Sequence, residues 1–326
     1  MCHQYHSLIG ASPSMQNIYH KIDKVAKSNA SVLITGETGT GKELCASAIH
    51  KESHRNNKPF IVLNCATIPK ELMESEFFGY VPGAFTGALK TKQGFAYQAT
   101  NGTLFLDEIG DMDITLQSKL LRLVQDGSFY KLGSDKLEKV NIRFICATHR
   151  VLPLEIKAGR FREDLYHRLN VIPINLPPLR ERGNDILLLT QHFLKKYTRI
   201  ENKTFQNFTQ QIEQIFLSYR WPGNIRELQN VIKRIVVLNE EQSLSSDTLL
   251  TYLRENSVHS FEPEAQVLDL SVVEAKKIRP LEEVEKEAIL EAVNFCHGNV
   301  VLAAELLKVS KATLYRRLRK WGINLN

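Results

Sequence analysis

The chain has 326 residues, 43% of them hydrophobic and 24% charged, which predicts about two domains of ordinary globular composition. We expect a cytoplasmic protein with no membrane segment and no signal peptide. No apolar run approaches the ~18 residues of a membrane span, and the N-terminus has no basic region leading into an apolar stretch. Five scattered cysteines without CxxC spacing argue against a disulfide framework or a zinc site, and the net charge of +6 decides little by itself.

Short β-rich apolar runs alternate with amphipathic stretches from residue 30 to about 176. This alternation predicts a parallel sheet covered by helices on both faces. A purely helical pattern follows over 185–253. A stretch rich in Ser, Glu and Pro at 255–280 then predicts a linker, although its apolar patch at 267–270 could dock, and a last helical unit runs over 281–323. The runs that predict strands are 31–35, 60–64, 103–107, 143–147 and 171–174.

The first strand leads into a glycine-rich loop with the sequence GETGTGKE, followed by a helical pattern over 44–50. A GxxxxGK segment between a strand and a helix predicts a loop that binds phosphates. Gly39 and Gly41 allow backbone N–H groups to face a phosphate, the helix adds its positive dipole, and Lys42 can reach the β- and γ-phosphates. Glu43 stands where a Ser or Thr usually holds Mg²⁺. The candidate nucleotide-binding residues are Gly36, Glu37, Thr38, Gly39, Thr40, Gly41, Lys42 and Glu43.

The predicted strand over 103–107 ends in two acids, Asp107 and Glu108. One carboxylate can hold Mg²⁺, often through water, and the other can polarise an attacking water. An isolated acidic pair could instead cap a helix. Together with the phosphate loop, the pair predicts hydrolysis of a nucleoside triphosphate.

Arg162 and Arg168 lie in a charged helical segment with Asp164 between them. By spacing alone, such arginines are usually solvated or paired with acids. The alternative is that one or both stabilise charge on a γ-phosphate, as arginine fingers do. A finger supplied to a neighbour's site requires head-to-tail subunits, and such contacts close into rings.

These motifs and the hexapeptide GAFTGA at 83–88 resemble the AAA+ activators of sigma-54 RNA polymerase, also called bacterial enhancer-binding proteins. The resemblance extends from about residue 8 to the C-terminus. By composition alone the hexapeptide would be an ordinary flexible loop, but it is highly specific to this family. Further matching segments are NCA at 64–66, ESEFFG at 74–79, LRER at 179–182 and WPGNIREL at 221–228.

The resemblance implies an α/β fold: a AAA+ P-loop NTPase core with a parallel sheet and a helical lid, plus a C-terminal all-α helix-turn-helix domain. It implies the domain boundaries 7–178 for the nucleotide-binding subdomain, 179–254 for the lid, 255–280 for the linker and 281–326 for the DNA-binding domain. It also implies a hexameric ring, a dimer in the resting state, and ATP with Mg²⁺.

The resemblance also assigns roles to individual residues. Lys42 and its loop bind ATP, Asp107 serves Mg²⁺ through water, and Glu108 is the catalytic carboxylate. Asn64 looks like the switch residue that holds this glutamate until the γ-phosphate state changes. The trans-acting fingers are Arg162 and Arg168, and the lid sensor is Arg226. The residues that contact sigma-54 are Gly83, Ala84, Phe85, Thr86, Gly87 and Ala88. Glu43 is the family's usual residue after the lysine.

The chain departs from the family pattern at a few positions. His149 stands where Asn is common, although an imidazole can still donate a hydrogen bond. Tyr80, Val81 and Pro82 replace the usual lead into the hexapeptide and remove a carboxylate. Asn101 replaces a glycine. None of these changes affects Asp107 or Glu108, so we expect the activity to persist.

The C-terminal segment predicts a helix-turn-helix of the factor-for-inversion-stimulation type, which it resembles. Two short helical patterns, 300–307 and 310–320, flank a tight turn, and the second is basic. Ser310 is a candidate N-cap, and Lys308 stands where a glycine often occurs, which implies strain if its φ is positive. The helical pattern from 281 to 295 is expected to supply a dimer helix. The candidate DNA-binding residues are Lys311, Thr313, Arg316, Arg317 and Lys320.

The expected function is an ATP-driven transcription activator that binds upstream DNA and remodels the sigma-54 RNA polymerase closed complex. Because the phosphate loop begins at Gly36, we expect no preceding receiver domain, so either a separate regulatory protein controls the chain or a regulatory domain was removed. One alternative is a DNA-binding repressor with a vestigial ATPase, which the intact Lys42, Asp107 and Glu108 argue against. Another is a AAA+ helicase loader or replication initiator, which would not need the hexapeptide.

Overall fold

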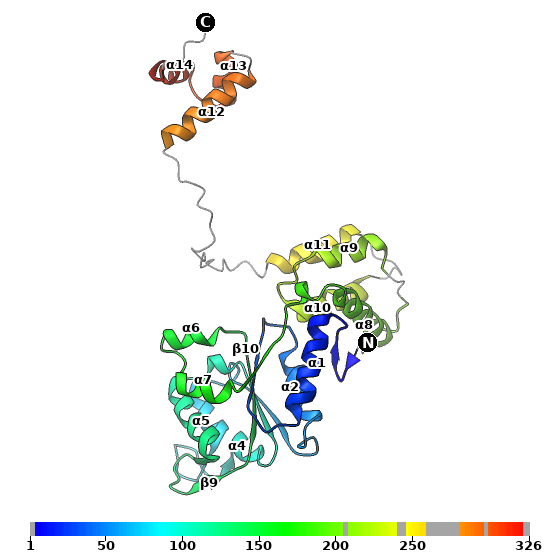
Figure 1. The fold of residues 1–326 in the computed structure, drawn as a ribbon, viewed down its shortest axis with the longest axis vertical. Coiled ribbons are helices and arrows are strands. Elements are labelled where there is room, and N and C mark those ends of the chain that lie inside the picture. The colour runs from blue at the N-terminus through cyan, green and yellow to red at the C-terminus, as the bar shows by residue number, and fades with distance from the viewer. Residues whose placement is uncertain (1–3, 205–207, 240–245, 259–280, 297–298, 322–326) are drawn as a thin grey trace. The chain divides into compact units, whose positions relative to one another are not determined.

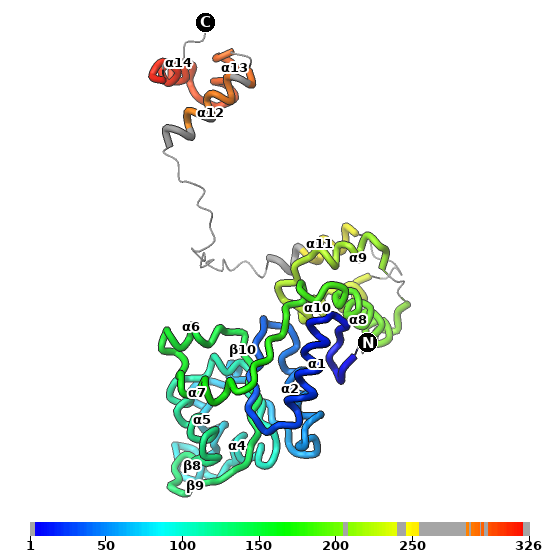
Figure 2. Tube along the Cα trace, in the orientation of Figure 1, coloured from blue at the N-terminus to red at the C-terminus, as the bar shows by residue number. Residues whose placement is uncertain are grey.

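The computed structural model describes residues 4–204, 208–239, 246–258, 281–296 and 299–321. The chain divides into two compact units at residue 260. The first unit holds a central sheet and a group of helices, and the described residues of the second unit form three helices (Figure 1). The trace in Figure 2 follows the same course.

Five parallel strands form the central sheet, and their spatial order is β11-β3-β10-β7-β4. They coincide with the five predicted runs, with ends that differ by at most a residue, so the expected parallel sheet is confirmed. The strands are β3 (Val32–Thr35), β4 (Phe60–Asn64), β7 (Thr103–Asp107), β10 (Arg143–Thr148) and β11 (Ile172–Asn175).

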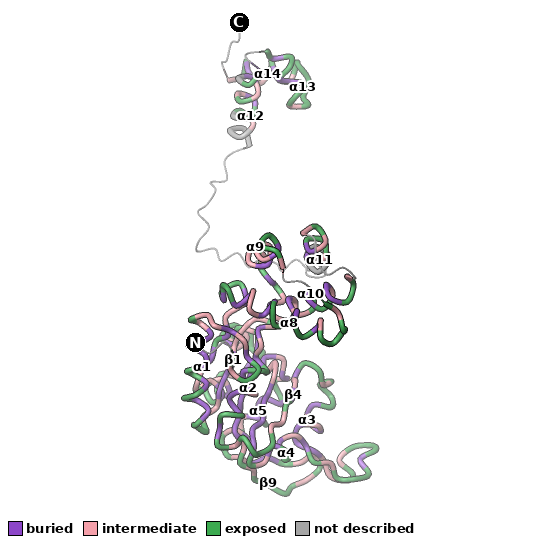
Figure 3. Tube along the Cα trace, turned by 90° about the vertical axis from the view of Figure 1, so that its right-hand side faces the viewer, coloured by how far each residue is buried: buried purple, intermediate pink, exposed green. Residues whose placement is uncertain are grey.

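Alternate residues of the strands point to two separate apolar cores, one on each face of the sheet. Ile34, Phe105 and Ile145 belong to one core, and Leu33 and Leu104 belong to the other. Both faces of the inner strands β3, β7 and β10 are buried, which explains why these strands read as nearly continuous apolar runs, whereas the edge strands β4 and β11 are partly exposed. Figure 3 colours each residue of the trace by its burial. The first face is covered by α1 (Pro13–Ala26) and α2 (Lys42–Lys51), and the second by α3 (Lys70–Phe78), α5 (Ile114–Asp126) and α7 (Glu163–Leu169).

Several short elements decorate this core and were not predicted. Two of them are small antiparallel strand pairs, which contact each other because Tyr80 of one forms a β-bridge with Leu132, which lies between the strands of the other. Their strands are β5 (Gly79–Tyr80) with β6 (Lys92–Gln93), and β8 (Ser128–Tyr130) with β9 (Leu137–Lys139). The remaining short elements are β1 (Gln4–Tyr5), β2 (Leu8–Ile9), α4 (Phe95–Gln98), α6 (Leu152–Lys157) and the 3-10 turns η1 (Ile109–Asp111) and η2 (Leu179–Glu181).

The helical region after the sheet has its own core, centred on Phe216, Trp221 and Ile232. It confirms the expected helical lid. Its helices are α8 (Asp185–Ile200), α9 (Gln210–Ser218), α10 (Asn224–Leu238) and α11 (Ser246–Val258). Helix α11 therefore continues into the segment predicted as a linker. Residues 259–280, including the apolar patch at 267–270, lie outside the described residues, and the exact domain boundaries stay predictions.

The C-terminal unit consists of α12 (Leu281–Phe295), α13 (Val300–Leu306) and α14 (Lys311–Lys320). Ala303, Ala304, Leu314 and Leu318 are buried in its small core. This arrangement confirms the expected helix-turn-helix.

Neither disulfides nor membrane-length helices occur in the described part of the chain. Cys45, Cys65, Cys146 and Cys296 are buried free thiols, and Cys2 lies outside the described residues. Among the described helices, none is both long enough and apolar enough to cross a membrane.

Candidate functional site

The carboxyl ends of the central strands bring most of the predicted site residues together. The phosphate loop follows β3, Asn64 ends β4, and Asp107 ends β7. The register of β4 against β7 pairs Asn64 directly with Asp107. Because all five strands are parallel, these ends share one edge of the sheet, which is where α/β proteins bind ligands.

The phosphate loop has the backbone that its glycines predict. Gly39 and Gly41 adopt φ of +80° and +99°, which is a conformation favoured by glycine, and α2 begins directly after Gly41. Lys42 is 6% exposed. Its Nζ donates to the carbonyl oxygens of Gly36 and Glu37 at 3.1 and 3.3 Å, and lies 3.5 Å from Glu108 Oε1. The lysine ammonium thus joins the loop to the acidic pair.

Glu108 adopts a left-handed backbone conformation, with φ 50° and ψ 48°. Such a conformation is strained for a residue with a Cβ, and strained residues cluster at functional sites. It directs the side chain toward Lys42 and His149. The neighbouring Asp107 Oδ1 is buried and finds no hydrogen-bond partner among the described residues. A buried orphan carboxylate oxygen is suited to a ligand such as a hydrated cation.

Besides Lys42, His149 contacts Glu108, whereas Asn64 hydrogen-bonds to the neighbouring Asp107. The backbone N–H of His149 donates to Glu108 Oε2 at 3.1 Å, and its ring Nδ1 lies 2.7 Å from the same oxygen. Asn64 instead donates from Nδ2 to Asp107 Oδ2 at 3.2 Å. The sequence departure at residue 149 therefore provides the contact that the resemblance assigned to Asn64. The role of Asn64 as a switch stays a prediction.

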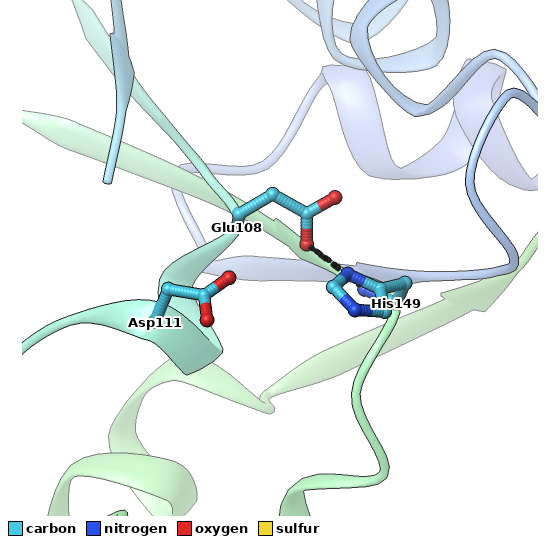
Figure 4. Close-up of side chains that lie close together, drawn as sticks. All are labelled: Glu108, Asp111 and His149. Atoms are coloured by element: carbon cyan, nitrogen blue, oxygen red, sulfur yellow. Dashed lines mark hydrogen bonds and ion pairs between the residues drawn. The ribbon is translucent and has the colours of Figure 1, made fainter. Parts of the chain in front are cut away.

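Asp111 completes a small group of side chains with Glu108 and His149 (Figure 4). One ligand atom from each lies within 4.8 Å of the others. Arg150 forms an ion pair with Asp111, so this carboxylate already has a cationic partner.

The two acids have opposite pKa shifts. Burial and the charge of Glu108 raise the pKa of Asp107, and the Lys42 charge and a backbone hydrogen bond oppose them without cancelling them. For Glu108, burial acts to raise the pKa, but the hydrogen bonds from His149 and the Lys42 charge outweigh it, so the pKa is lowered. Glu108 is therefore the better stabilised carboxylate in this arrangement.

A cavity of about 510 Å³ opens beside the loop. Its walls include Gly36, His149, Tyr166, Asn175 and Arg180. This volume lies within the range of small-molecule sites. The loop and the histidine that contacts Glu108 therefore border on space of ligand size.

The predicted arginines lie in three different settings. Arg162 is the N-cap of α7, and its guanidinium pairs with Asp164 at 2.7 Å and donates to Ser118 Oγ at 3.0 Å. Arg168 is exposed on α7. Arg226 is exposed in the first turn of α10, and its Cβ lies 3.1 Å from a Cβ built on Gly39. Only Arg226 of the three is thus brought next to the phosphate loop of its own chain, and the assigned roles of all three stay predictions.

The lid region contacts the phosphate loop through residues to which the sequence assigned no role. Arg180 forms a bidentate pair with Glu37, at 2.6 and 2.8 Å. Arg182 is 1% exposed and donates to the carbonyl oxygen of Thr40 at 2.9 Å. Asn224, at the start of α10, contacts the loop as well. The LRER and WPGNIREL segments contain these residues, but a linear pattern carries no signal for which distant loop they meet.

The hexapeptide forms an exposed loop between β5 and β6. The N–H of Gly83 donates to the carbonyl oxygen of Ala88 at 2.9 Å and closes the loop at its base. Phe85 is 44% exposed, and its ring lies edge-on to Tyr80 with centroids 4.9 Å apart. Tyr80 replaces a residue of the usual family lead, so this departure provides a ring contact for Phe85.

The hairpin of β8 and β9 supports the base of the hexapeptide loop. The N–H of Val81 donates to the carbonyl oxygen of Leu132 at 3.1 Å, and the N–H of Leu132 donates to that of Gly79 at 2.9 Å. Gly133 lies so close to Ala84 that a side chain at residue 133 would press against it. The loop that the resemblance assigns to sigma-54 is therefore held at its base by hydrogen bonds and exposed at its tip.

In the C-terminal unit both predicted helix starts are capped. Ser310 Oγ accepts from the N–H of Thr313 at 3.2 Å, and Asn299 Oδ1 accepts from the N–H groups of Val301 and Leu302, each at 3.2 Å. Lys308, in the turn between α13 and α14, has φ 56°. The conditional expectation of strain at this residue therefore applies.

The candidate DNA-binding residues do not share one environment. Lys311, Arg316 and Lys320 are exposed on α14, whereas Thr313 is half-buried. Arg317 is also half-buried and pairs with Glu285 of α12 at 2.5 Å. The first three side chains are thus presented at the surface, and their DNA contacts stay predictions.

Three protein families match the chain, in the order in which the folded regions occur. Residues 8–175 match the Sigma-54 interaction domain, residues 180–266 match the AAA+ ATPase lid domain, and residues 280–321 match the Fis family of bacterial regulatory proteins.

Curated relatives and solved structures agree with these matches. The Luminescence regulatory protein LuxO of Vibrio campbellii is 50% identical over 318 residues, which are 98% of this chain and 70% of the relative. The Transcriptional regulatory protein ZraR of Escherichia coli is 44% identical over 96% of this chain and 68% of the relative. The structure of NtrX from Brucella abortus in complex with ATP superposes with a TM-score of 0.69 at 32% identity, over 97% of this chain and 69% of that chain.

The AAA+ core with its phosphate loop and acidic pair, the lid and the Fis-type helices occur together in one chain, and the matches cover all three. The chain binds ATP, is an ATPase, and has sigma-54 and DNA as partners. It belongs to the family of sigma-54-dependent transcriptional activators.

Proposed function

We propose that this chain uses ATP hydrolysis to remodel the sigma-54 RNA polymerase closed complex and so allows promoter opening, while its C-terminal helices hold upstream DNA. The observation that carries the proposal is the position of the hexapeptide. Phe85 and Thr86 are exposed, and the loop is anchored on the same folded unit that holds the nucleotide site. A change at the nucleotide site can therefore act on the loop through a packed scaffold.

Hydrolysis is assigned to the phosphate loop and to Glu108. Lys42 and the loop N–H groups bind the phosphates, and Glu108 polarises the attacking water. The contact from His149 supports this role, because it orients the carboxylate and keeps it ionised. Arg226 is assigned to sense nucleotide from the lid.

The residues present fit a magnesium ion. Asp107 offers a buried carboxylate oxygen without a partner among the described residues, and carboxylates and water are ligands that Mg²⁺ prefers. We therefore infer that Asp107 holds Mg²⁺, directly or through water. When bound, the ion neutralises phosphate charge.

We further propose a hexameric ring in which Arg162 and Arg168 serve a neighbouring subunit, with a dimer as the resting state. The exposure of Arg168 supports a role outside its own chain. If the fingers act in trans, ATPase activity per subunit must rise steeply with protein concentration. Turnover per subunit that stays constant down to dilutions where only monomers remain would refute the trans assignment.

The C-terminal helices are proposed to bind upstream DNA through Lys311, Thr313, Arg316, Arg317 and Lys320. The exposure of Lys311, Arg316 and Lys320 on α14 supports this assignment. Basic side chains of this kind give salt-dependent affinity for phosphates. We propose that α12 contributes to the dimer.

The test is ATP-dependent open-complex formation on a sigma-54 promoter, with the whole chain and its Thr86→Ala variant. Thr91→Ala is the matched control, because Thr91 is an exposed threonine that lies beyond the hexapeptide. We expect the wild-type chain and the control to open the promoter, and Thr86→Ala to hydrolyse ATP without opening it.

Two outcomes would contradict this proposal. If Thr86→Ala opens the promoter as well as the wild-type chain does, the hexapeptide is not the coupling element. If the wild-type chain hydrolyses ATP but opens no sigma-54 promoter, even with a regulatory protein supplied, the remodelling activity is refuted.

A further inference from the structure

Four consecutive residues of the phosphate loop, 37–40, are hydrogen-bonded by residues of the lid region. Glu37 pairs with Arg180, and Arg182 donates to the carbonyl oxygen of Thr40. Between them, the carbonyl oxygen of Thr38 accepts from Asn224, and that of Gly39 accepts from the N–H of Ile225 at 3.0 Å. The lid and the loop are thus joined residue by residue.

The backbone contacts all use carbonyl oxygens of the loop. The acceptors are the carbonyl oxygens of Thr38, Gly39 and Thr40. Phosphates are bound by backbone N–H groups and not by carbonyls. The contacts therefore fix the shape of the loop without engaging the groups that a nucleotide needs.

Asn224 connects three segments with one side chain. Its Nδ2 donates to the carbonyl oxygen of Thr38 at 3.0 Å and to Glu37 Oε2 at 3.1 Å, and its Oδ1 accepts from the N–H of Leu179 at 2.8 Å. The residue is fully buried. A buried amide with its donors and acceptor in use holds its partners in a defined geometry.

The backbone and the charges around Asn224 support the same reading. Its φ is 52°, a conformation that asparagine tolerates better than most residues. Hydrogen bonds from Arg180 and from Asn224 lower the pKa of Glu37, so the carboxylate that both contact stays ionised. At Gly39, a side chain would overlap the carbonyl oxygen of Gly223, which shows how closely the start of α10 approaches the loop.

We propose that Asn224 is a positioning residue for ATP binding, which holds the phosphate loop in its nucleotide-binding shape and ties that shape to the lid. The inference rests on the proposed assignment of residues 36–43 as the phosphate site. A loop held in shape before binding loses less freedom when the ligand arrives, so the affinity rises. Because Asn224 has no contact with Glu108 or His149 among the described residues, its loss should change binding and not the chemical step.

The first test compares Asn224→Gly with the wild-type chain. Glycine accepts the positive φ, so the variant removes the side chain without adding backbone strain. The matched control is Asn202→Gly, because Asn202 has φ 51° and is exposed in the lid. We expect the dissociation constant of a fluorescent ATP analogue and the KM for ATP to rise about tenfold in Asn224→Gly, with kcat changed less than about twofold, as for the loss of the two hydrogen bonds that Asn224 donates to the loop. The control should equal the wild-type chain.

A second test uses the exposed ion pair between Arg180 and Glu37, which Asn224 also contacts. Arg180 and Glu37 have side chains about two-fifths exposed, at 41% and 42%, so replacing them does not endanger the core. We expect Arg180→Gln and Glu37→Gln each to weaken nucleotide binding about two- to threefold, and the double variant to be no worse than either single one.

The results separate this inference from the assignment on which it rests. If the wild-type chain binds no nucleotide, or Lys42→Ala binds it equally well, the phosphate site itself is refuted. If the wild-type chain binds and Asn224→Gly binds equally well, or loses kcat with unchanged affinity, the role of Asn224 is overturned. Should near-UV circular dichroism show that Asn224→Gly is unfolded, the Arg180 and Glu37 variants decide, and unchanged affinity in both overturns the proposal.

Discussion

The phosphate loop and the hexapeptide loop both contain glycines with positive φ, but they use them in different ways. Gly39 has φ +80° and Gly83 has φ +83°. At Gly39 an added Cβ would overlap the backbone of Gly223, whereas at Gly83 and Gly87 it would meet nothing within 4 Å. In the phosphate loop the missing side chain allows the lid to approach. In the hexapeptide loop it allows only the backbone conformation.

This difference matches the two roles assigned to the loops, ATP binding and contact with sigma-54. The loop assigned to ATP is shaped by neighbours on several sides, so its geometry is set before a ligand arrives. The loop assigned to sigma-54 is fixed at its base and open at its tip, where Phe85 is exposed and its ring packs edge-on against Tyr80. The proposed coupling of hydrolysis to remodelling would use such a pair, a nucleotide site of fixed geometry and an exposed contact loop.

The largest expected effect comes from closing the space at Gly39. In Gly39→Ala the Cβ would meet the carbonyl oxygen of Gly223 in a conformation that L-residues avoid, so the loop or the lid must shift. We expect nucleotide affinity to fall at least about a hundredfold, beyond the loss of single hydrogen bonds. Equilibrium binding of a fluorescent ATP analogue measures this. Near-wild-type affinity would show that the contact with the lid is dispensable.

The next effect concerns the contact between His149 and Glu108. In His149→Ala, Glu108 loses the ring contact at 2.7 Å, so we expect kcat to fall about ten- to a hundredfold, as for a mispositioned general base. His149→Asn keeps a donor and should recover part of this loss. Single-turnover ATP hydrolysis checks both variants. Equal rates in His149→Ala and the wild-type chain would show that the ring contact of His149 with Glu108 is not needed for hydrolysis.

A smaller effect is expected at the tip of the hexapeptide loop. In Gly87→Ala the added methyl group finds open space, and only the φ of +96° penalises it. We expect unchanged ATPase activity. The free energy of unfolding should fall by about 1–2 kcal/mol, which is the backbone strain of the loop conformation. Measurements of ATP turnover and thermal unfolding, beside Gly39→Ala, test the contrast. An equal loss of ATPase activity in both variants would remove the distinction between the two loops.

The smallest effect is a pH dependence at the edge of the phosphate loop. Hydrogen bonds from Arg180 lower the pKa of Glu37, with a contribution from Asn224. Since the pKa is lower in the folded state, the stabilisation is fully present above the ordinary glutamate pKa and is lost as the pH falls through the lowered value. The wild-type chain should have a larger free energy of unfolding than Glu37→Gln. This difference should decrease by up to about 1 kcal/mol on acidification, a small amount because the pair is exposed. Urea titrations over this pH range measure it, and a difference independent of pH would contradict it.

The sheet and the short motifs could be predicted from the sequence because their signals are local. The five strands are contiguous apolar runs, and the phosphate loop, Asp107 and Glu108 lie directly at strand ends. The expected strain at Lys308 also rests on a local signal, because the positive φ arises in the short turn between two neighbouring helices.

Contacts between distant segments could not be predicted. Which residue meets Glu108 depends on the register of β10 beside β7 and on the strained backbone of Glu108 itself, and neither is visible in a linear pattern. The same holds for Asn224, which reaches a loop far back in the chain. The short hairpins were missed for a different reason: strands of two or three residues are too brief to show an alternation.

The position of Lys42 has a consequence for when Glu108 becomes reactive. The ammonium group is shared among two loop carbonyls and the Glu108 carboxylate, so the arrival of a triphosphate exchanges partners and does not simply add one. If Lys42 turns to the phosphate, as the proposed site requires, Glu108 loses one of the neighbours that lower its pKa, while the larger contribution from His149 remains. In the hydrolytic role that we propose for Glu108, we therefore expect its affinity for a proton from water to rise when the substrate binds.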